Sequence, residues 1–198
     1  MLERIRPRYN RLTLSLGKAS LKLGLSPNFW TLLGLFMAVL GSLMIASGNL
    51  WFGLVLIIAM IAADTLDGAT ARAGNRTSPF GAVLDHVTDR YAEFFLVGGF
   101  MVGQWISPAL GIFTASGIIM ASYVRAKAES MGGIKNCTVG ITGRGEKLAI
   151  MILAIVLFAA GSRLAAQWMI VLIGVLSHIT AIWRLLYTRS VLIRSRQP

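Results

Sequence analysis

The stretch LWFGLVLIIAMIAADTLDGATARA occupies residues 50–73 and combines two features. It begins with an apolar run long enough to cross a membrane as a helix, since about 20 residues span the hydrocarbon core. It ends with two carboxylates, Asp64 and Asp67, and with Arg72. A carboxylate at membrane depth is costly and marks a candidate functional site. The stretch therefore predicts a membrane protein whose functional site lies at one end of this helix.

The composition of the whole chain agrees with this prediction. Hydrophobic residues make up 56% of the 198 residues, charged residues make up 14%, and the mean hydropathy is +0.70. Soluble domains contain about 25% charged residues, so an ordinary soluble domain and a disordered chain are excluded. A single cysteine, Cys137, excludes an internal disulfide. We expect no signal peptide, because no short apolar stretch with a cleavage site follows the basic N-terminus.

Six apolar stretches predict an all-α integral membrane protein with six transmembrane helices. Glycine, asparagine, serine and proline residues separate the stretches. Their ranges are Asn28–Ser47, Leu50–Ala73, Ser78–Gly103, Ser107–Lys127, Glu146–Gly161 and Ala165–Leu186. We expect an amphipathic juxtamembrane helix over residues 1–25, the six-helix domain over 26–190 and a basic tail over 191–198.

Lysine and arginine residues gather in the loops on one side of these predicted spans. Arg163 is the only basic residue expected on the other side. Because cytoplasmic loops are enriched in Lys and Arg, both termini are predicted to be cytoplasmic, in a multi-pass protein of the cell membrane. This asymmetry also explains the net charge of +11, so no nucleic-acid partner is expected.

The first 25 residues have an apolar stripe at alternating spacings of three and four, with basic residues on the other faces. The stripe consists of Leu2, Ile5, Tyr9, Leu12, Leu16, Ala19 and Leu23. This pattern favours a helix that lies in the cytoplasmic interface and contacts membrane lipids, with Arg and Lys reaching lipid phosphates. The alternative is a solvated juxtamembrane tail.

Four aspartates fall in the second and third apolar stretches. Asp64 and Asp67 share one helix face, as do Asp85 and Asp89, and a short loop joins the two helices. At 1.5 Å per residue, all four should meet in the cytoplasmic third of the membrane. Hard oxygen ligands of this kind suit Mg²⁺, Mn²⁺ or Ca²⁺. The alternative is a set of structural ion pairs with nearby arginines, namely Arg72, Arg76 and Arg90.

The stretch from Asp64 to Asp89 resembles the signature of the CDP-alcohol phosphotransferases, D-x2-D-G-x2-A-R-x8-G-x3-D-x3-D, and fills every fixed position. The resemblance implies an enzyme that transfers a phosphoryl-lipid group from a CDP-linked lipid to an alcohol and releases CMP. It implies that Mg²⁺, or Mn²⁺, is held by Asp64, Asp67, Asp85 and Asp89. It also implies that Asp89 is the general base for the acceptor hydroxyl. Contacts to the CDP-lipid are implied for Asn28, Phe29, Trp30, Thr31, Gly68, Arg72 and Ser78.

The second half of the chain resembles the phosphatidylinositol-phosphate synthase branch and its archaeal counterpart, the archaetidylinositol phosphate synthases. That branch binds inositol phosphate through basic residues, which implies an acceptor-phosphate site at Ser122, Arg125, Lys127, Arg144, Lys147 and Arg184. A homodimer with an active site open to the cytoplasm is also implied. Gly143 and Trp183 depart from the pattern of the branch, so glycerol phosphate, serine or inositol stays open as acceptor, and the basic cluster could reflect topology alone.

Two other classes of protein place carboxylates in a membrane. Aspartate-rich prenyltransferases also hold a diphosphate through Mg²⁺, but their two aspartate motifs lie far apart, unlike the compact group here. A divalent-cation transporter could line an ion path with carboxylates. No acidic site on the predicted outer side completes such a path. The sequence does not decide between a diacylglycerol and an archaeal diether lipid.

Overall fold

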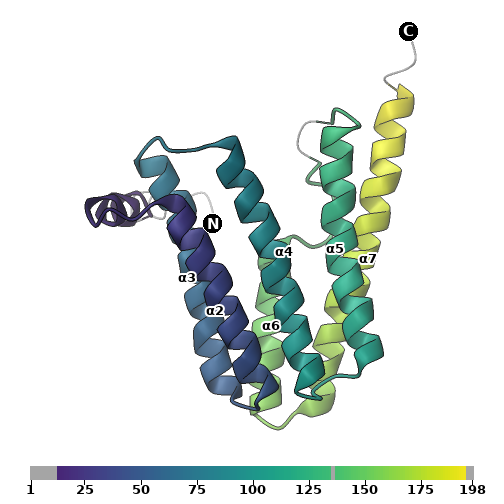
Figure 1. The fold of residues 1–198 in the computed structure, drawn as a ribbon. Coiled ribbons are helices and arrows are strands. Elements are labelled where there is room, and N and C mark those ends of the chain that lie inside the picture. Colours follow the sequence, from purple (N-terminus) through teal and green to yellow (C-terminus); the bar gives the residue numbers. More distant parts are fainter. Residues whose placement is uncertain (1–12, 135–136, 195–198) are drawn as a thin grey trace, which may run out of the picture. The chain divides into compact units, whose positions relative to one another are not determined.

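The computed structural model describes residues 13–134 and 137–194, and every regular element in these ranges is a helix (Figure 1). A helical segment over residues 13–22 precedes six longer helices. These are α2 (Pro27–Ala46), α3 (Leu50–Ala73), α4 (Pro79–Val102), α5 (Pro108–Ser130), α6 (Arg144–Ala159) and α7 (Arg163–Arg194). The predicted all-helical fold is confirmed. The main difference is that α7 continues beyond Leu186 to Arg194, into the predicted tail.

Local sequence explains where these helices begin and end. Ser107 caps α5, because its Oγ accepts a hydrogen bond from the Leu110 N–H at 3.2 Å, and Pro108 occupies the first turn. Gly48 follows α2 with a φ of +86°. This left-handed conformation suits glycine and ends the helix before α3 begins.

The chain divides into two compact units. Unit 1 consists of residues up to Met44 together with Phe52–Leu96, and contains most of α2, α3 and α4. Unit 2 consists of Ile45–Trp51 and the chain from Val97 onward, and contains α5, α6 and α7. All four aspartates of the signature belong to unit 1, whereas the basic residues of the predicted acceptor site belong to unit 2.

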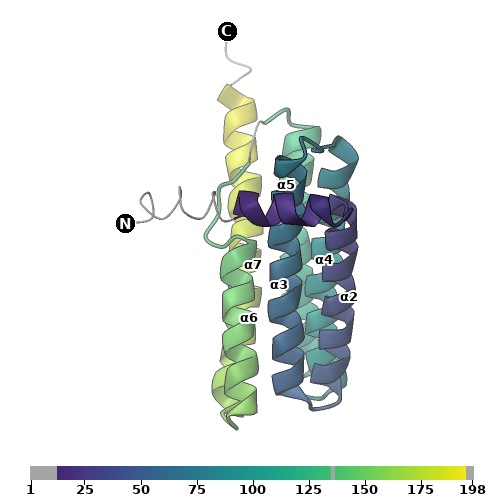
Figure 2. The same cartoon turned by 90° about the vertical axis from the view of Figure 1, so that its left-hand side faces the viewer.

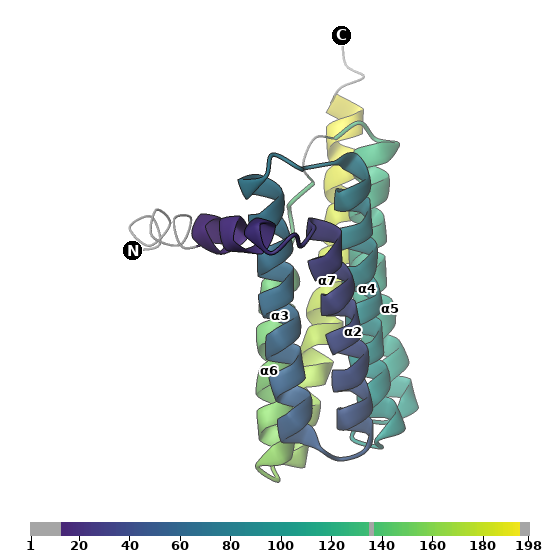
Figure 3. The same cartoon turned by 60° about the vertical axis from the view of Figure 1, so that its left-hand side comes forward.

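In unit 1, α2, α3 and the part of α4 before residue 97 run side by side (Figure 3). Small residues allow α2 and α3 to approach closely, since a Cβ built on Gly41 would lie 3.4 Å from the Gly53 carbonyl oxygen. The hydroxyl of Ser42 donates to the Phe95 carbonyl at 2.6 Å and connects α2 to α4. A polar group with its partner inside the bundle is favoured over one facing lipid.

In unit 2, α7 packs against both α5 and α6 (Figure 1). Thr114 donates from Oγ1 to the Ile170 carbonyl at 3.2 Å. A Cβ on Gly117 would lie 3.0 Å from the Gly174 carbonyl oxygen. These contacts resemble the small-residue interfaces of membrane helices, where backbones pack closely without large side chains between them.

Four of the described helices, α2, α3, α5 and α7, are long and apolar enough to cross a membrane. Large apolar side chains on them are exposed, for example Leu43, Val55 and Ile112. The other two differ for identifiable reasons: α4 contains the charged residues of the aspartate motif, and α6 has only 16 residues. The described helices therefore indicate a membrane protein, and the six-span arrangement stays a prediction.

The helical segment 13–22 belongs to unit 1 and lies across the end of α3 (Figures 2 and 3). Its buried face is made of small residues, with Thr13 and Ser20 less than 5% exposed and Gly17 buried between them. Leu16 and Leu23, which belong to the predicted apolar stripe, are exposed. The part of the stripe before residue 13 lies outside the described residues.

Candidate active site

Two helix ends bring the signature carboxylates together. Asp64 and Asp67 lie in the last turns of α3, and Asp85 and Asp89 lie in the first turns of α4. Carboxylate oxygens of Asp64, Asp67 and Asp85 all lie within 4.8 Å of one another. A second group within the same limit joins Asp85 and Asp89 to His86. The structure therefore brings Asp64, Asp67 and Asp85 together, and Asp89 lies close to Asp85 in the second group.

This donor set suits a hard divalent cation. Two oxygens that bind one such ion at about 2.0–2.6 Å are themselves at most about 4–5 Å apart. The spacing of the three carboxylates falls in that range. Asp67 and Asp89 are buried, where a nearby positive charge is favourable to a carboxylate. His86 is largely exposed, and its Nδ1 lies 4.0 Å from Asp85 Oδ2. This distance fits a local contact as well as a ligand role.

A hydroxyl from α2 holds one of these carboxylates. Thr31 Oγ1 donates a hydrogen bond to Asp67 Oδ2 at 2.9 Å, and both side chains are buried. Partners of this kind fix the orientation of a metal-binding carboxylate. The sequence had placed Thr31 only in the segment implied to contact CDP-lipid. Its contact with Asp67 depends on how α2 packs against α3. The spacing of residues within one helix does not predict such a contact.

The starts of α2 and α4 lie close together beside these carboxylates. The Oγ of Ser78 accepts from the Gly81 N–H at 3.0 Å and caps α4. A Cβ on Gly81 would lie 3.7 Å from Asn28 Oδ1. Free N–H groups at a helix start suit an anionic or polar ligand. The residues implied to bind CDP-lipid from α2 and α4 are thus neighbours in unit 1.

Near the end of α3, the guanidinium of Arg72 lies over Gly68. A Cβ on Gly68 would be 3.0 Å from Arg72 Nη1. The absent side chain therefore leaves room for the guanidinium to lie along the helix.

Two aromatic residues of the segment 28–31 lie side by side at the start of α2. Phe29 is exposed, and its ring meets that of Trp30 edge-on with centroids 5.6 Å apart.

An ion pair missed by the sequence analysis continues from the motif along α4. Glu93 is 1% exposed, and its Oε2 lies 2.5 Å from Arg90 Nη1. Arg90 Nη2 lies 3.7 Å from Asp89 Oδ2, so one guanidinium faces both carboxylates. The i, i+3 spacing of Arg90 and Glu93 is the signal that could have indicated this pair.

In unit 2, the expected acceptor residues have partners that position them. Arg125 Nε donates to Glu129 Oε1 at 3.0 Å, and the same oxygen accepts from the Cys137 N–H at 3.0 Å. Lys127 Nζ lies 5.6 Å from the centre of the Tyr123 ring. Glu129, which the sequence analysis did not single out, therefore connects the end of α5 to the loop that follows.

Arg184 is buried on α7 and holds backbone from two other segments. Its Nε donates to the Val139 carbonyl at 2.9 Å, and its Nη1 donates to the Ala121 carbonyl at 2.7 Å. One helical turn before Arg184, the hydroxyl oxygen of Thr180 accepts a hydrogen bond from the Ile141 N–H at 3.3 Å. Arg184 thus has a structural role that the sequence did not predict, in addition to its expected role with phosphate.

The loop held in this way leads directly into α6. Gly140 has a φ of +137°, and a Cβ there would lie 2.5 Å from Thr180 Cγ2. Glu146 Oε2 accepts from the Gly143 N–H at 2.9 Å, which fixes the start of α6 at Arg144. Lys147, one turn into α6, is 5% exposed. Ser122, a remaining residue of the expected site, lies near the end of α5.

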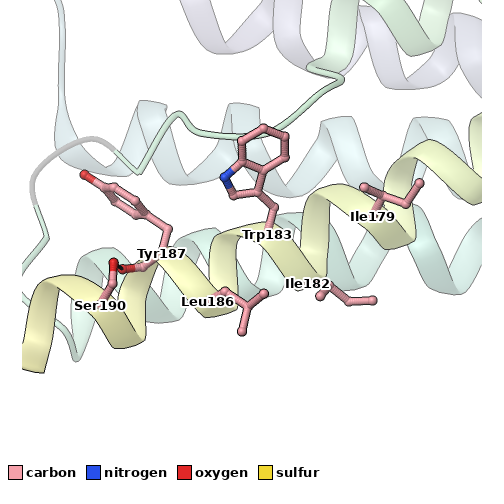
Figure 4. A pocket seen from close by; sticks show the side chains of 6 residues that line it. All are labelled: Ile179, Ile182, Trp183, Leu186, Tyr187 and Ser190. Carbon is pink, nitrogen blue, oxygen red and sulfur yellow. Dashed lines mark hydrogen bonds between the residues drawn. The ribbon is translucent and has the colours of Figure 1, made fainter.

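The surface of α7 also has an apolar hollow, shown in Figure 4. Its lining comes from this one helix and consists of Ile179, Ile182, Trp183, Leu186, Tyr187 and Ser190. Charged side chains are absent from this lining. In a membrane protein such a surface suits lipid chains or another apolar helix better than a charged substrate.

A family model described as CDP-alcohol phosphatidyltransferase matches residues 24–183. The archaetidylinositol phosphate synthase of Pyrococcus horikoshii is 32% identical over 185 residues, which cover 93% of this chain and 94% of that protein. The phosphatidylinositol phosphate synthase of Mycobacterium tuberculosis with CDP-DAG bound has a TM-score of 0.80 and 26% identity, and the match covers 90% of this chain and 94% of that one.

The same Mycobacterium tuberculosis protein in complex with manganese and citrate has a TM-score of 0.78 and 27% identity, over 89% of this chain and 88% of that one. A divalent cation in a similar fold agrees with the grouping of the carboxylates described above. The family match includes the whole aspartate signature and most of the helices. This chain therefore belongs to the CDP-alcohol phosphatidyltransferase family and is an enzyme of that class.

Proposed function

We propose that this enzyme transfers a phosphoryl-lipid group from a CDP-linked lipid to a hydroxyl of inositol phosphate, with release of CMP. One observation supports the proposal above all: the carboxylates of Asp64, Asp67 and Asp85 lie within 4.8 Å of one another. The names of similar proteins, archaetidylinositol phosphate synthase and phosphatidylinositol phosphate synthase, support inositol phosphate as the acceptor.

In this proposal, Asp64, Asp67, Asp85 and Asp89 hold Mg²⁺, and Mn²⁺ can replace it. A divalent ion there supplies charge to stabilise the diphosphate and the departing CMP. Thr31 keeps the Asp67 carboxylate oriented through its 2.9 Å hydrogen bond. The CDP part of the donor contacts Gly68, Arg72, Ser78 and the segment 28–31.

Asp89 acts as the general base in this mechanism. It accepts the proton of the acceptor hydroxyl while the hydroxyl oxygen forms a bond to the lipid-linked phosphorus. The bond between that phosphorus and the oxygen of CMP breaks, and CMP leaves. Asp89 is buried and lies beside Arg90, which is itself paired with Glu93. A base in this position is shielded from bulk water.

The acceptor phosphate is bound in this proposal by the basic residues of unit 2. They are Arg125, Lys127, Arg144, Lys147 and Arg184, with Ser122 beside them. A dianionic phosphate requires several charge-assisted hydrogen bonds, and a neutral inositol or a serine does not. The fixed position of Arg184 favours precise recognition, because its Nε and Nη1 are already bound to backbone carbonyls.

We further propose that all six long helices cross the membrane, with both termini and the active site on the cytoplasmic side. The excess of Lys and Arg in the loops on one side of the spans supports this orientation. The chain would then function in the cell membrane as a homodimer, for which the exposed apolar face of α7 is a candidate interface (Figure 4). Crosslinking in membranes tests the dimer, and labelling of single cysteines placed in the loops tests the orientation.

The decisive experiment uses purified enzyme in lipid nanodiscs with Mg²⁺ and a CDP-linked lipid. CDP-diacylglycerol and a CDP-linked archaeal diether are tested in parallel. Each donor is offered inositol phosphate, glycerol phosphate, serine or inositol, and release of CMP is measured. The proposal expects CMP release with inositol phosphate well above that with the other acceptors. Preference for an unphosphorylated acceptor would contradict it.

The same assay tests the acceptor site. Arg144→Gln should raise the KM for inositol phosphate by about 10- to 150-fold, since a hydrogen bond to a charged group contributes about 1.5–3 kcal/mol. The KM for the CDP-linked lipid should change much less. If the KM for the CDP-linked lipid rises and the KM for inositol phosphate does not, Arg144 is not part of the acceptor site. That result would not contradict the proposed transfer reaction.

A further inference from the structure

The helical segment 13–22 makes an unusually close contact with α3. A Cβ built on Gly17 would lie 2.2 Å from the Ala69 carbonyl oxygen and 3.0 Å from Ala73 Cβ. Ala69 directly follows Gly68 and lies two residues after Asp67. Because the nearest atom is backbone, no side-chain rotation on α3 could make room for a larger residue. Gly17 is therefore packed against the part of the chain that contains the aspartate signature.

A hydrogen bond connects the same segment to the start of α2. Trp30 Nε1 donates to Ser20 Oγ at 2.6 Å. Ser20 is 3% exposed and lies on the face of the segment that also includes Gly17. The next residue after Trp30 is Thr31, which donates to Asp67. Segment 13–22 thus contacts both helices that meet at this carboxylate.

These contacts form a closed circuit within unit 1. From Gly17 the circuit passes through Ala69 to Asp67, then through Thr31 and Trp30 back to Ser20. The contacts between elements are one close backbone packing contact and two short hydrogen bonds, and the other connections follow the chain, so a shift of segment 13–22 must move α2 or α3. The exposed leucines on its other face are not involved.

We propose that Gly17 is a positioning residue for CDP-lipid binding. It allows segment 13–22 to hold the start of α2 against α3, which keeps Thr31 in place beside Asp67 and the segment 28–31 in place for the nucleotide. The inference rests on the proposed function, because it assigns Gly17 to the donor site of that reaction. Gly17 itself contacts neither substrate nor metal and acts through Ala69.

The smallest test is Gly17→Ala. In a helix facing solvent, alanine is more favourable than glycine, so this change would normally strengthen the segment. Here the added methyl group would meet the Ala69 carbonyl at 2.2 Å and push the segment off α3. We expect the KM for the CDP-linked lipid to rise by about tenfold, which corresponds to about 1.4 kcal/mol. The KM for the acceptor should stay within about twofold, a difference of less than 1 kcal/mol.

Ser20→Ala tests the second connection and should raise the same KM in the same direction. Gly17→Leu is a larger change at the packed position. Its matched control is Ala19→Leu, because Ala19 is an exposed residue of the same helix. We expect Ala19→Leu to behave like the wild type, and Gly17→Leu to exceed the effect of Gly17→Ala. If Gly17→Leu does not fold, as judged by its thermal unfolding in nanodiscs, Gly17→Ala and Ser20→Ala decide the question.

Inhibition by free CDP separates positioning from membrane attachment. CDP is soluble, so its inhibition constant does not depend on how the segment meets lipid. The proposal expects this constant to rise in Gly17→Ala in parallel with the KM for the lipid donor. Unchanged inhibition by CDP, or equal KM values for Gly17→Ala and wild type, would overturn the proposal. Failure of the wild-type enzyme to use any CDP-linked lipid would instead overturn the proposed function.

Discussion

Replacement of Thr31 by valine removes one hydroxyl from the proposed metal site and keeps the shape of the side chain. In the structure this hydroxyl donates to Asp67 Oδ2 at 2.9 Å, in a buried position. A hydrogen bond to a charged group contributes about 1.5–3 kcal/mol, or about 10- to 150-fold in affinity. Mutation of a residue that orients a metal ligand costs about 10- to 100-fold in metal affinity or activity. The two estimates agree, so Thr31→Val should require about 10- to 100-fold more Mg²⁺ for half-maximal turnover.

The assay is CMP release at saturating CDP-lipid and acceptor while Mg²⁺ is titrated, and Mn²⁺ is titrated in parallel. Thr65→Val is the matched control, because Thr65 lies between Asp64 and Asp67 in sequence. Its hydroxyl donates to the Ile61 carbonyl of its own helix at 3.0 Å and not to a carboxylate of the motif. Loss of that bond leaves the carboxylates unchanged, and the Mg²⁺ requirement should shift by less than about threefold, below 1 kcal/mol. Thr31→Ser should restore most of the wild-type requirement.

Two results would refute this reasoning. If Thr31→Val titrates with Mg²⁺ like the wild type, the hydrogen bond to Asp67 does not affect the metal site. If Thr65→Val is as impaired as Thr31→Val, the effect comes from general loss of packing around α3 and not from the orientation of Asp67.

Substitutions at four further positions test the motif, the ion pair that follows it on α4 and the proposed acceptor site. Asp67→Asn should abolish turnover and weaken CDP-lipid binding in Mg²⁺, and near-normal turnover would contradict the metal assignment. Asp89→Asn should keep substantial CDP-lipid binding but lose about 10²–10⁴-fold in turnover, the contribution of a general base; wild-type turnover would place the base elsewhere. Glu93→Gln should lower the free energy of unfolding by about 1–2 kcal/mol, because Arg90 loses its nearer carboxylate partner and keeps Asp89 at 3.7 Å; an unchanged unfolding midpoint in nanodiscs would contradict this. Arg184→Gln should lower stability and raise the acceptor KM by about tenfold or more, with Arg184→Lys rescuing only in part; a rise in the CDP-lipid KM alone would argue against it.

The helices themselves could be predicted from the sequence. Long apolar runs define them, and glycine, serine and proline mark their ends, so the observed bounds of α2 and α3 lie within a residue or two of the expected ones. The grouping of Asp64, Asp67 and Asp85, and the proximity of Asp89 to Asp85, could also be predicted. Spacings of three and four place them on one face of each helix, and the short loop between α3 and α4 requires those faces to be neighbours.

The contacts between helices could not be predicted in this way. The apolar stripe of the N-terminal helix gave no sign that its small-residue face is the buried one, with Gly17 against Ala69. Glycine and serine in a helix are compatible with exposure, with a turn or with close packing, and only the partner surface decides among these.

The sequence by itself determined the fold class, the membrane character and the carboxylates that can bind a cation, because each depends on composition or on spacing within one helix or across one short loop. The tertiary structure decided which side chains support them: Thr31 on Asp67, and Arg184 on the backbone of two other segments. The physical reason is that a hydrogen bond or a close packing contact requires atoms to meet within a few ångströms. Between helices that distance is set by how their surfaces interlock, which the spacing of residues along one chain does not specify.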